Sequence, residues 1–226
     1  MNRSVIELIE VSKKYESGNV TALDKVSFSI PKGSITSICG KSGCGKTTLL
    51  NMIGGLDVPS SGEVFVLGTN ISKMQESKLG NFRSAHIGFV FQFFNLIPEL
   101  TARENIIFPL AIQKKQINIV EINKIIDLLQ INDTLDRLPS KLSGGQQQRI
   151  AIARAVVNSP QIILMDEPTG NLDEDNANIV KMLIQKLRSE LGITVFFVTH
   201  DHDMAHIADQ IITLKDGHIE SIEGIS

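Results

Sequence analysis

Residues 40–47, GKSGCGKT, bring glycines, a lysine and a threonine together in the spacing G-x-x-x-x-G-K-[ST]. A loop of this kind between a strand and a helix wraps its backbone N–H groups around phosphate oxygens, and the helix N-terminus adds a favourable field. Lys46 is expected to reach the terminal phosphates of a nucleotide, and the Thr47 hydroxyl to bind Mg²⁺. The glycines let the chain approach the phosphates closely. The stretch predicts a nucleotide site whose spacing differs from the G-x-G-x-x-G of dinucleotide folds.

Two adjacent acids end the apolar stretch ILMDEP, residues 163–168. In an open parallel sheet the ligand lies outside the carboxyl ends of the strands, where a phosphate loop also emerges. Asp166 is therefore expected to hold Mg²⁺ through water. Glu167, on the opposite side of the pleat, is expected to face the attacking water as general base. His200 follows a second apolar strand and is expected to contact the γ-phosphate, although a lone histidine after a strand is usually structural.

Apolar runs and turn signals alternate along the chain in the manner of an α/β fold. Leu183, Leu187 and Leu191 fall at four-residue spacing in the last long helix, and Gly192 marks its end. Strands that alternate with helices predict a mostly parallel sheet covered by helices. The expected strands are 34–39, 64–67, 86–92, 161–166 and 193–199 with a hairpin at 211–221, and the expected helices include 47–53, 144–157 and 173–191.

Composition limits the classes of partner. With 22 basic and 25 acidic residues the net charge is -3, which argues against a nucleic-acid partner. Cys39 and Cys44 are too few for a disulfide framework and are expected to be reduced thiols in a cytosolic protein. Apolar runs such as 195–198 fall far short of the roughly 20 residues that a membrane-spanning helix needs. No N-terminal segment resembles a signal peptide, so any membrane role is expected to come through a partner.

Six short motifs carry a family resemblance. GKSGCGKT, the Gln92 of HIGFVFQ, LSGGQ (142–146), ILMDE (163–167), NLD (171–173) and TH (199–200) occur in the order found in ATP-binding cassette ATPases. The chain resembles this family over nearly its whole length, and LSGGQ is the most specific single motif. The resemblance implies an α/β P-loop NTPase core, with a mostly parallel sheet between helices on both faces, an N-terminal antiparallel β part and an inserted helical lobe. One domain is expected over 1–226, with core segments 1–92 and 159–226 and the lobe at about 93–158.

The resemblance also implies a shared active site that binds ATP and Mg²⁺. In this family the signature segment faces the γ-phosphate bound by a second subunit, so two copies pack head to tail around two ATPs. Tyr15 would stack on adenine, Gln92 would bind Mg²⁺, and Asp173 would cross the interface near the partner's phosphate loop. The expected nucleotide-binding residues are Tyr15, Gly40, Lys41, Ser42, Gly43, Cys44, Gly45, Lys46, Thr47, Thr48, Gln92, Ser143, Gly144, Gly145, Gln146 and Asp173. The expected metal-binding residues are Thr47, Gln92 and Asp166, and the expected catalytic residues are Glu167, His200 and Lys46.

Two longer stretches indicate the subgroup. GGLDVPSSGEV (54–64) and FVFQFFNLIPELTARENIIFPL (89–110) look most like the ATPases of the lipoprotein-releasing, macrolide-exporting and antimicrobial-peptide-resistance group. Such cassettes work with a separate membrane permease. The apolar segment Phe93–Phe108 is either core of the lobe itself or a groove that receives the permease.

The resemblance therefore implies a peripheral protein on the cytoplasmic side of the cell membrane, in an exporter or mechanotransmission complex for peptides, antibiotics or lipoproteins. Two alternatives stay open. One is an ATP-dependent regulatory module of the cell-division type, in which hydrolysis only resets the dimer, and the other is an importer cassette.

Overall fold

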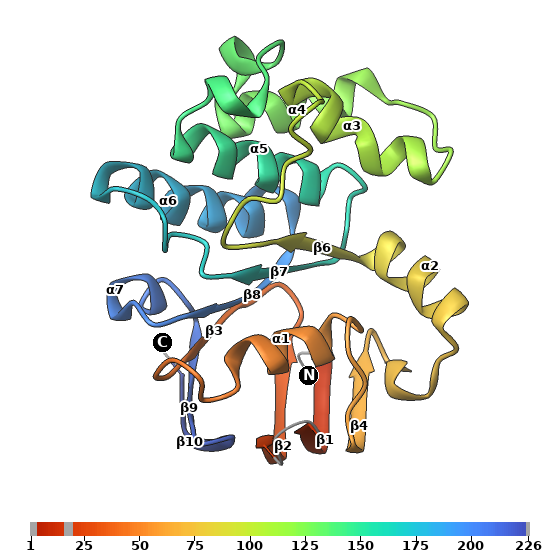
Figure 1. Cartoon of the computed structure of the whole chain (residues 1–226), viewed down its shortest axis with the longest axis vertical. Coiled ribbons are helices and arrows are strands. Elements are labelled where there is room, and N and C mark those ends of the chain that lie inside the picture. The colour runs from red at the N-terminus through yellow and green to blue at the C-terminus, as the bar shows by residue number, and fades with distance from the viewer. Residues whose placement is uncertain (1–3, 16–19, 225–226) are drawn as a thin grey trace.

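A six-stranded sheet forms the centre of the computed structural model, which describes residues 4–15 and 20–224. The order across the sheet is β10-β9-β3-β8-β7-β6, in which all neighbours are parallel except the β9/β10 hairpin (Figure 1). The strands are β3 (Ile35–Cys39), β6 (Ile87–Val90), β7 (Ile162–Asp166), β8 (Thr194–Thr199), β9 (Gln210–Lys215) and β10 (His218–Gly224).

The inner strands are apolar because helices or strands cover both of their faces. Every residue of β3 and β8 is buried, which explains the continuous apolar runs in the sequence. Alternate residues of β8 join different cores: Val195 and Phe197 pack with the helices α5 (Gly144–Val156) and α6 (Glu174–Leu191). Phe196 and Val198 pack with α1 (Lys46–Ile53) and with a second, antiparallel sheet.

The antiparallel sheet lies below this core in Figure 1 and has the order β2-β1-β4-β5. Its strands alternate buried and exposed residues along much of their length, as expected for a sheet with one face on the core. The strands are β1 (Ser4–Tyr15), β2 (Val20–Pro31), β4 (Ser61–Val66) and β5 (Thr69–Asn70).

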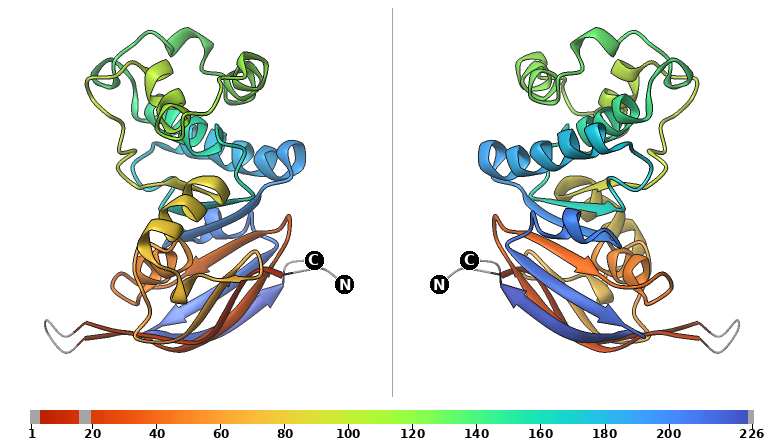
Figure 2. Two further views of the ribbon diagram at one scale, coloured as in Figure 1. Left: turned by 90° about the vertical axis from the view of Figure 1, so that its right-hand side faces the viewer. Right: turned by 90° about the vertical axis from the view of Figure 1, so that its left-hand side faces the viewer.

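The segment between β6 and β7 is helical and lies at the top of the molecule in Figures 1 and 2. It holds α3 (Ala102–Ile112), α4 (Ile119–Leu129) and α5, together with the 3₁₀ turns η2 (Asn132–Thr134) and η3 (Pro139–Lys141). The remaining helices are η1 (Ile71–Lys73), α2 (Glu76–His86) and α7 (His202–Ala205). In the part of the chain that the structure describes, no helix has the length and apolar character needed to cross a bilayer.

The expected α/β fold is confirmed, and most differences are at the ends of elements. The last long helix begins at Glu174, because Asp173 caps it by accepting the N–H of Asn176 at 2.8 Å. Helix α2 was not expected; only Leu79 of its eleven residues is buried, and it carries no clear apolar stripe. Of the three leucines at four-residue spacing in this helix, Leu183 and Leu187 are buried, whereas Leu191 is 43% exposed, because α6 ends there and the chain turns at Gly192.

Two leucines of α6 allow a matched test of this packing. Leu187 is fully buried against the sheet and Leu191, one turn later, is not. We expect Leu187→Ala to lower the free energy of unfolding by about 2–5 kcal/mol, since it removes buried methyl groups and leaves a cavity. Leu191→Ala should change it by less than about 0.5 kcal/mol. Urea unfolding of both variants measures the difference, and equal losses would contradict the assignment of the buried face.

Candidate active site

The phosphate loop follows β3 and leads directly into α1, as the sequence predicts. Gly43 and Gly45 have φ of 80° and 107°, in the left-handed region that other residues rarely adopt. A Cβ on Gly45 would overlap the carbonyl oxygen of Ala22, and a Cβ on Gly40 would overlap that of Leu214. Two of the loop glycines are therefore needed because neighbouring backbone lies against them.

Lys46 points back into the loop. It is only 8% exposed, and its Nζ donates to the carbonyl oxygens of Gly40 at 2.7 Å and Lys41 at 3.0 Å. An ammonium group has three donors and no acceptor, so it is suited to phosphate oxygens in the same place. A nucleotide phosphate bound in the loop would compete with these carbonyls for Lys46.

Asp166 lies at the end of β7, next to the start of α1. Its Oδ2 accepts a hydrogen bond from the Thr47 hydroxyl at 3.3 Å. Burial raises the pKa of Asp166 above its usual range, the charge of Glu167 raises it further, and the Thr47 hydroxyl and Lys46 offset only part of this. The structure thus brings together the Thr47 hydroxyl and the Asp166 carboxylate, the two groups expected to bind Mg²⁺. Burial makes the charged form of Asp166 costly.

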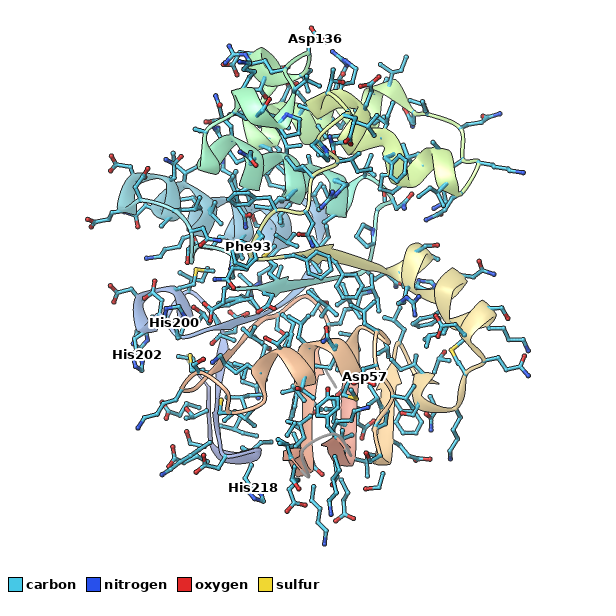
Figure 3. All side chains as sticks on the ribbon, viewed as in Figure 1. Asp57, Phe93, Asp136, His200, His202 and His218 are labelled. Carbon is cyan, nitrogen blue, oxygen red and sulfur yellow. The ribbon has the colours of Figure 1, made fainter. Side chains whose placement is uncertain are left out.

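Glu167 is held by the end of β8. Its φ is 46°, an unusual value for a residue with a side chain, and its N–H donates to the Val198 carbonyl at 3.0 Å. Its carboxylate accepts hydrogen bonds from the Thr199 hydroxyl at 3.2 Å, the His200 N–H at 3.3 Å and the His200 Nδ1 at 2.8 Å. Because a carboxylate only accepts, Nδ1 carries the hydrogen and Nε2 of the neutral ring is the acceptor. The His200 side chain is 65% exposed, at the left edge of Figure 3.

A cavity of about 700 Å³ collects these groups, which is within the usual range for a ligand site. Nine of the expected site residues line it together: Ser42, Gly43, Gly45, Lys46, Thr47, Thr48, Gln92, Asp166 and Glu167, with His200 as a tenth. Five further lining residues were not expected: Val20, Thr21, Ala22, Asp216 and Gly217. They come from the start of β2 and from the β9–β10 turn. The sequence signal for the turn was the Asp-Gly pair, which predicts a hairpin but no role at a ligand site.

Nine expected residues lie outside this lining: Tyr15, Gly40, Lys41 and Cys44, together with Ser143, Gly144, Gly145, Gln146 and Asp173, which are described below. Gly40, Lys41 and Cys44 line a neighbouring cavity on the other side of the phosphate loop. Tyr15 donates its hydroxyl to Asp57 at 3.0 Å, and its ring lies 5.0 Å from the ammonium group of Lys13. The stacking of Tyr15 on adenine stays a prediction.

Gln92 and the NLD segment meet beside the cavity. Gln92 follows β6, and its carbonyl oxygen accepts a hydrogen bond from the Asn171 side chain at 2.8 Å. Asp173, two residues later, caps α6 with a carboxylate whose pKa is lowered by the N–H and side-chain amide of Asn176. The sequence did not assign Asn171, although it lies inside a motif that was noted.

The signature segment lies away from the cavity. Ser143 caps α5: its Oγ accepts the N–H of Gln146 at 3.3 Å, and its own N–H donates to the Gln146 side chain at 3.0 Å. A Cβ on Gly145 would overlap the side chain of Asn176, so this glycine lets α5 pack on α6. None of the described residues that line the cavity comes from 142–146. In Figure 1 the N-terminal end of α5 nevertheless lies on the left, as do the phosphate loop and the carboxyl ends of β7 and β8.

The fold and the site together define a phosphate-loop nucleoside triphosphatase, with two adjacent acids at the carboxyl end of a central strand. Comparisons with known proteins give its family. Residues 23–170 match the family described as "ABC transporter". The lipoprotein-releasing system ATP-binding protein LolD of Francisella tularensis subsp. holarctica is 42% identical over 227 residues, which cover 98% of each chain.

Two further proteins agree with this assignment. The macrolide export ATP-binding/permease protein MacB of Rhodopirellula baltica is 40% identical over 219 residues, which cover 94% of this chain and 32% of MacB. A solved dimeric structure of the ATP-binding cassette MJ0796, in a post-hydrolysis state with ADP and Pi, is 41% identical with a TM-score of 0.89 and covers 98% of this chain and 99% of its own. The chain belongs to the ABC transporter family, and it is an ATP-hydrolysing subunit of that family.

The raised pKa of Asp166 gives a prediction about stability. The folded state disfavours the charged form of this carboxylate. At pH values above the raised pKa, ionisation of Asp166 therefore lowers the free energy of unfolding. This loss of stability becomes smaller as the pH falls toward the ordinary aspartate pKa of about 3.9. We expect Asp166→Asn to raise the melting temperature of the protein without added nucleotide at pH 7.5, by an amount that shrinks at acid pH. Asp133→Asn, at an exposed position, is the control. A lower melting temperature for Asp166→Asn than for the control would contradict the cost of burying this charge.

Proposed function

We propose that two copies of the chain bind two ATP molecules between them, each held by the phosphate loop of one copy and the signature segment of the other. The main support is the position of the signature segment outside the cavity of its own chain. Lys46, Asp166 and Glu167 line that cavity, but among the described residues none of 142–146 does. The N-terminal end of the 13-residue helix α5 lies on the same side of the molecule. Such an end attracts anions, and a two-fold arrangement lets one surface complete both sites.

The chain's own residues would divide the chemistry of ATP hydrolysis. Lys46 would neutralise charge on the terminal phosphates. Glu167, fixed by Val198, Thr199 and His200, would accept a proton from the attacking water. His200 would hold Glu167 through Nδ1 and present Nε2 to the cavity. Separation of the γ-phosphate from ADP would then weaken the contact between the two copies.

The residues beside the loop fit Mg²⁺. The described residues contain no group of three or more His, Cys, Asp or Glu side chains that could hold a metal alone. Mg²⁺ commonly binds through one or two carboxylates and substrate phosphates, and it keeps several waters. Thr47 and Asp166, joined at 3.3 Å, and Gln92 in the same cavity would hold it together with ATP. The ion would neutralise charge on the phosphates.

We further propose that a membrane permease docks beside the lobe, which would keep the chain on the cytoplasmic side of the membrane. A hollow of about 350 Å³ is lined by Phe89, Phe91, Pro109 and Ile112. Phe93, which follows β6 and lies near its left end in Figure 3, is 74% exposed, and exposed apolar groups of this kind commonly mark partner sites. The first part of the segment Phe93–Phe108 has five apolar residues, none of which is fully buried: Phe93, Phe94, Leu96, Ile97 and Leu100. Leu96 packs against the core.

Arg154 would connect this hollow to both halves of the ATP site. It lines the hollow, and its guanidinium donates to the carbonyl oxygens of Phe94 and Asn95, both of which have left-handed φ. Arg154 belongs to α5, the helix that begins with the signature segment, and Phe94 lies two residues after Gln92. A movement of the permease would therefore be transmitted both to the contact between the signature segment and the other copy's ATP and to the metal site. The likeness to LolD and MacB favours an exporter or mechanotransmission complex for lipoproteins, peptides or antibiotics.

The shared site predicts different defects for two variants. Glu167→Gln should bind ATP normally, hydrolyse it at least about 100-fold more slowly and accumulate as an ATP-dependent dimer. Ser143→Arg should leave ATP binding by the single chain intact, because Ser143 is remote from its own cavity, and should abolish the dimer in a Glu167→Gln background. ATP titration and analytical ultracentrifugation measure the two properties. If Ser143→Arg lost ATP binding and dimerisation together, the trans role would be contradicted.

The docking proposal is tested by two matched substitutions on the lobe. Ile112 and Ile119 are about equally exposed, but only Ile112 lines the hollow. Ile112→Glu should greatly reduce co-purification with the permease, identified from the neighbouring reading frames, while the isolated chain still binds ATP. Ile119→Glu should assemble normally. Equal assembly of both variants would show that the permease docks elsewhere.

A further inference from the structure

The turn between β9 and β10 lies against the phosphate loop, although about 170 residues separate them in sequence. The N–H of Gly217 donates to the carbonyl oxygen of Cys44 at 3.2 Å. The carbonyl oxygen of Gly217 accepts the N–H of Asp24 in β2 at 2.9 Å. Asp216 and Gly217 also line the ATP cavity. One residue of this turn, Gly217, thus links the phosphate loop to the antiparallel sheet.

The packing at this link is tight for a side chain on Gly217. Its φ is 78°, and an added Cβ would lie 3.0 Å from the Ala22 carbonyl oxygen and 3.3 Å from the Leu23 Cα. Gly45 of the phosphate loop approaches the same Ala22 oxygen. Ala22 is therefore packed between the turn and the loop, so a shift of any one of the three moves the others.

The link matters because three further hydrogen bonds of the loop only join residues of the loop to one another. Lys46 donates to Gly40 and Lys41, and the Cys44 N–H donates to the Lys41 carbonyl at 3.3 Å. The Lys46 contacts use the same ammonium group that ATP phosphates require. When Lys46 binds phosphate, the hydrogen bond from Gly217 to Cys44 still restrains the loop from outside.

We infer that Gly217 is a positioning residue for ATP binding: the Asp216–Gly217 turn holds the phosphate loop at a fixed place relative to β2. A displacement of about 1 Å in groups that orient a substrate can lower a reaction rate about 100-fold. Displaced amides of the phosphate loop would likewise bind phosphate less tightly, so the expected effect is a lower affinity for ATP. This inference needs only ATP binding by the loop. It does not depend on the proposed dimer or permease.

Gly68 offers a matched control. It lies in another hairpin turn, between β4 and β5, with φ of 77°, and an added Cβ there meets nothing within 4 Å. Gly217→Ala and Gly68→Ala thus impose the same backbone strain, but only the first crowds Ala22. Gly217→Asn separates the two effects further, because asparagine tolerates left-handed φ and still adds a Cβ.

The experiment measures the dissociation constant for ATP and the melting temperature of the full-length chain and the three variants. We expect Gly217→Ala and Gly217→Asn to bind ATP about tenfold more weakly, and Gly68→Ala to bind within about twofold of the unchanged chain. Gly68→Ala should still lower the melting temperature. Unchanged ATP affinity in either Gly217 variant would overturn the inference. If Gly217→Ala does not fold, Gly217→Asn alone decides.

Discussion

Backbone atoms pack against the phosphate loop from two sides, and the rest of the active site depends on this packing. The Leu214 carbonyl lies where a side chain on Gly40 would be, and the Ala22 carbonyl lies where one on Gly45 would be. Amide groups can bind phosphate only if they are oriented beforehand, because a flexible loop would lose conformational entropy on binding. The antiparallel sheet and the β9–β10 hairpin are therefore parts of the nucleotide site.

The parallel sheet provides the second part of the site at the carboxyl ends of its strands. β7 ends at Asp166, which Glu167 follows, and β8 ends at Thr199, which His200 follows. The side chains of Thr199 and His200 both donate hydrogen bonds to the carboxylate of Glu167. Within the proposed function, these groups would approach a nucleotide from one side only. Helix α5 begins on the same side of the molecule but outside this cavity. Within the proposed account, completion of the site by a second copy makes hydrolysis depend on association, and the permease can act on that association.

The sequence predicted well the features that depend on local spacing. The phosphate loop, the acids after β7 and the cap before α5 lie in short motifs beside elements with strong apolar patterns. It predicted poorly the features that depend on distant backbone. Nothing near Gly217 indicates that its neighbours would be Cys44 and Asp24. The turn of Tyr15 toward Asp57 likewise depends on a residue 42 positions away. The four-residue spacing of Leu183, Leu187 and Leu191 continues to the end of α6, but it does not indicate that burial stops before Leu191.

A crosslinking measurement tests the shared site most directly. One chain would carry Ser42→Cys beside the phosphates and Ser143→Cys at the start of α5, with Cys39→Ala and Cys44→Ser to remove other thiols and Glu167→Gln to retain ATP. A short bifunctional thiol reagent is then added with ATP, and the products are separated by mass and mapped by peptide analysis. The account predicts ATP-dependent products of dimer mass that join position 42 of one chain to position 143 of another. Products of monomer mass that join the two positions within one chain would contradict it.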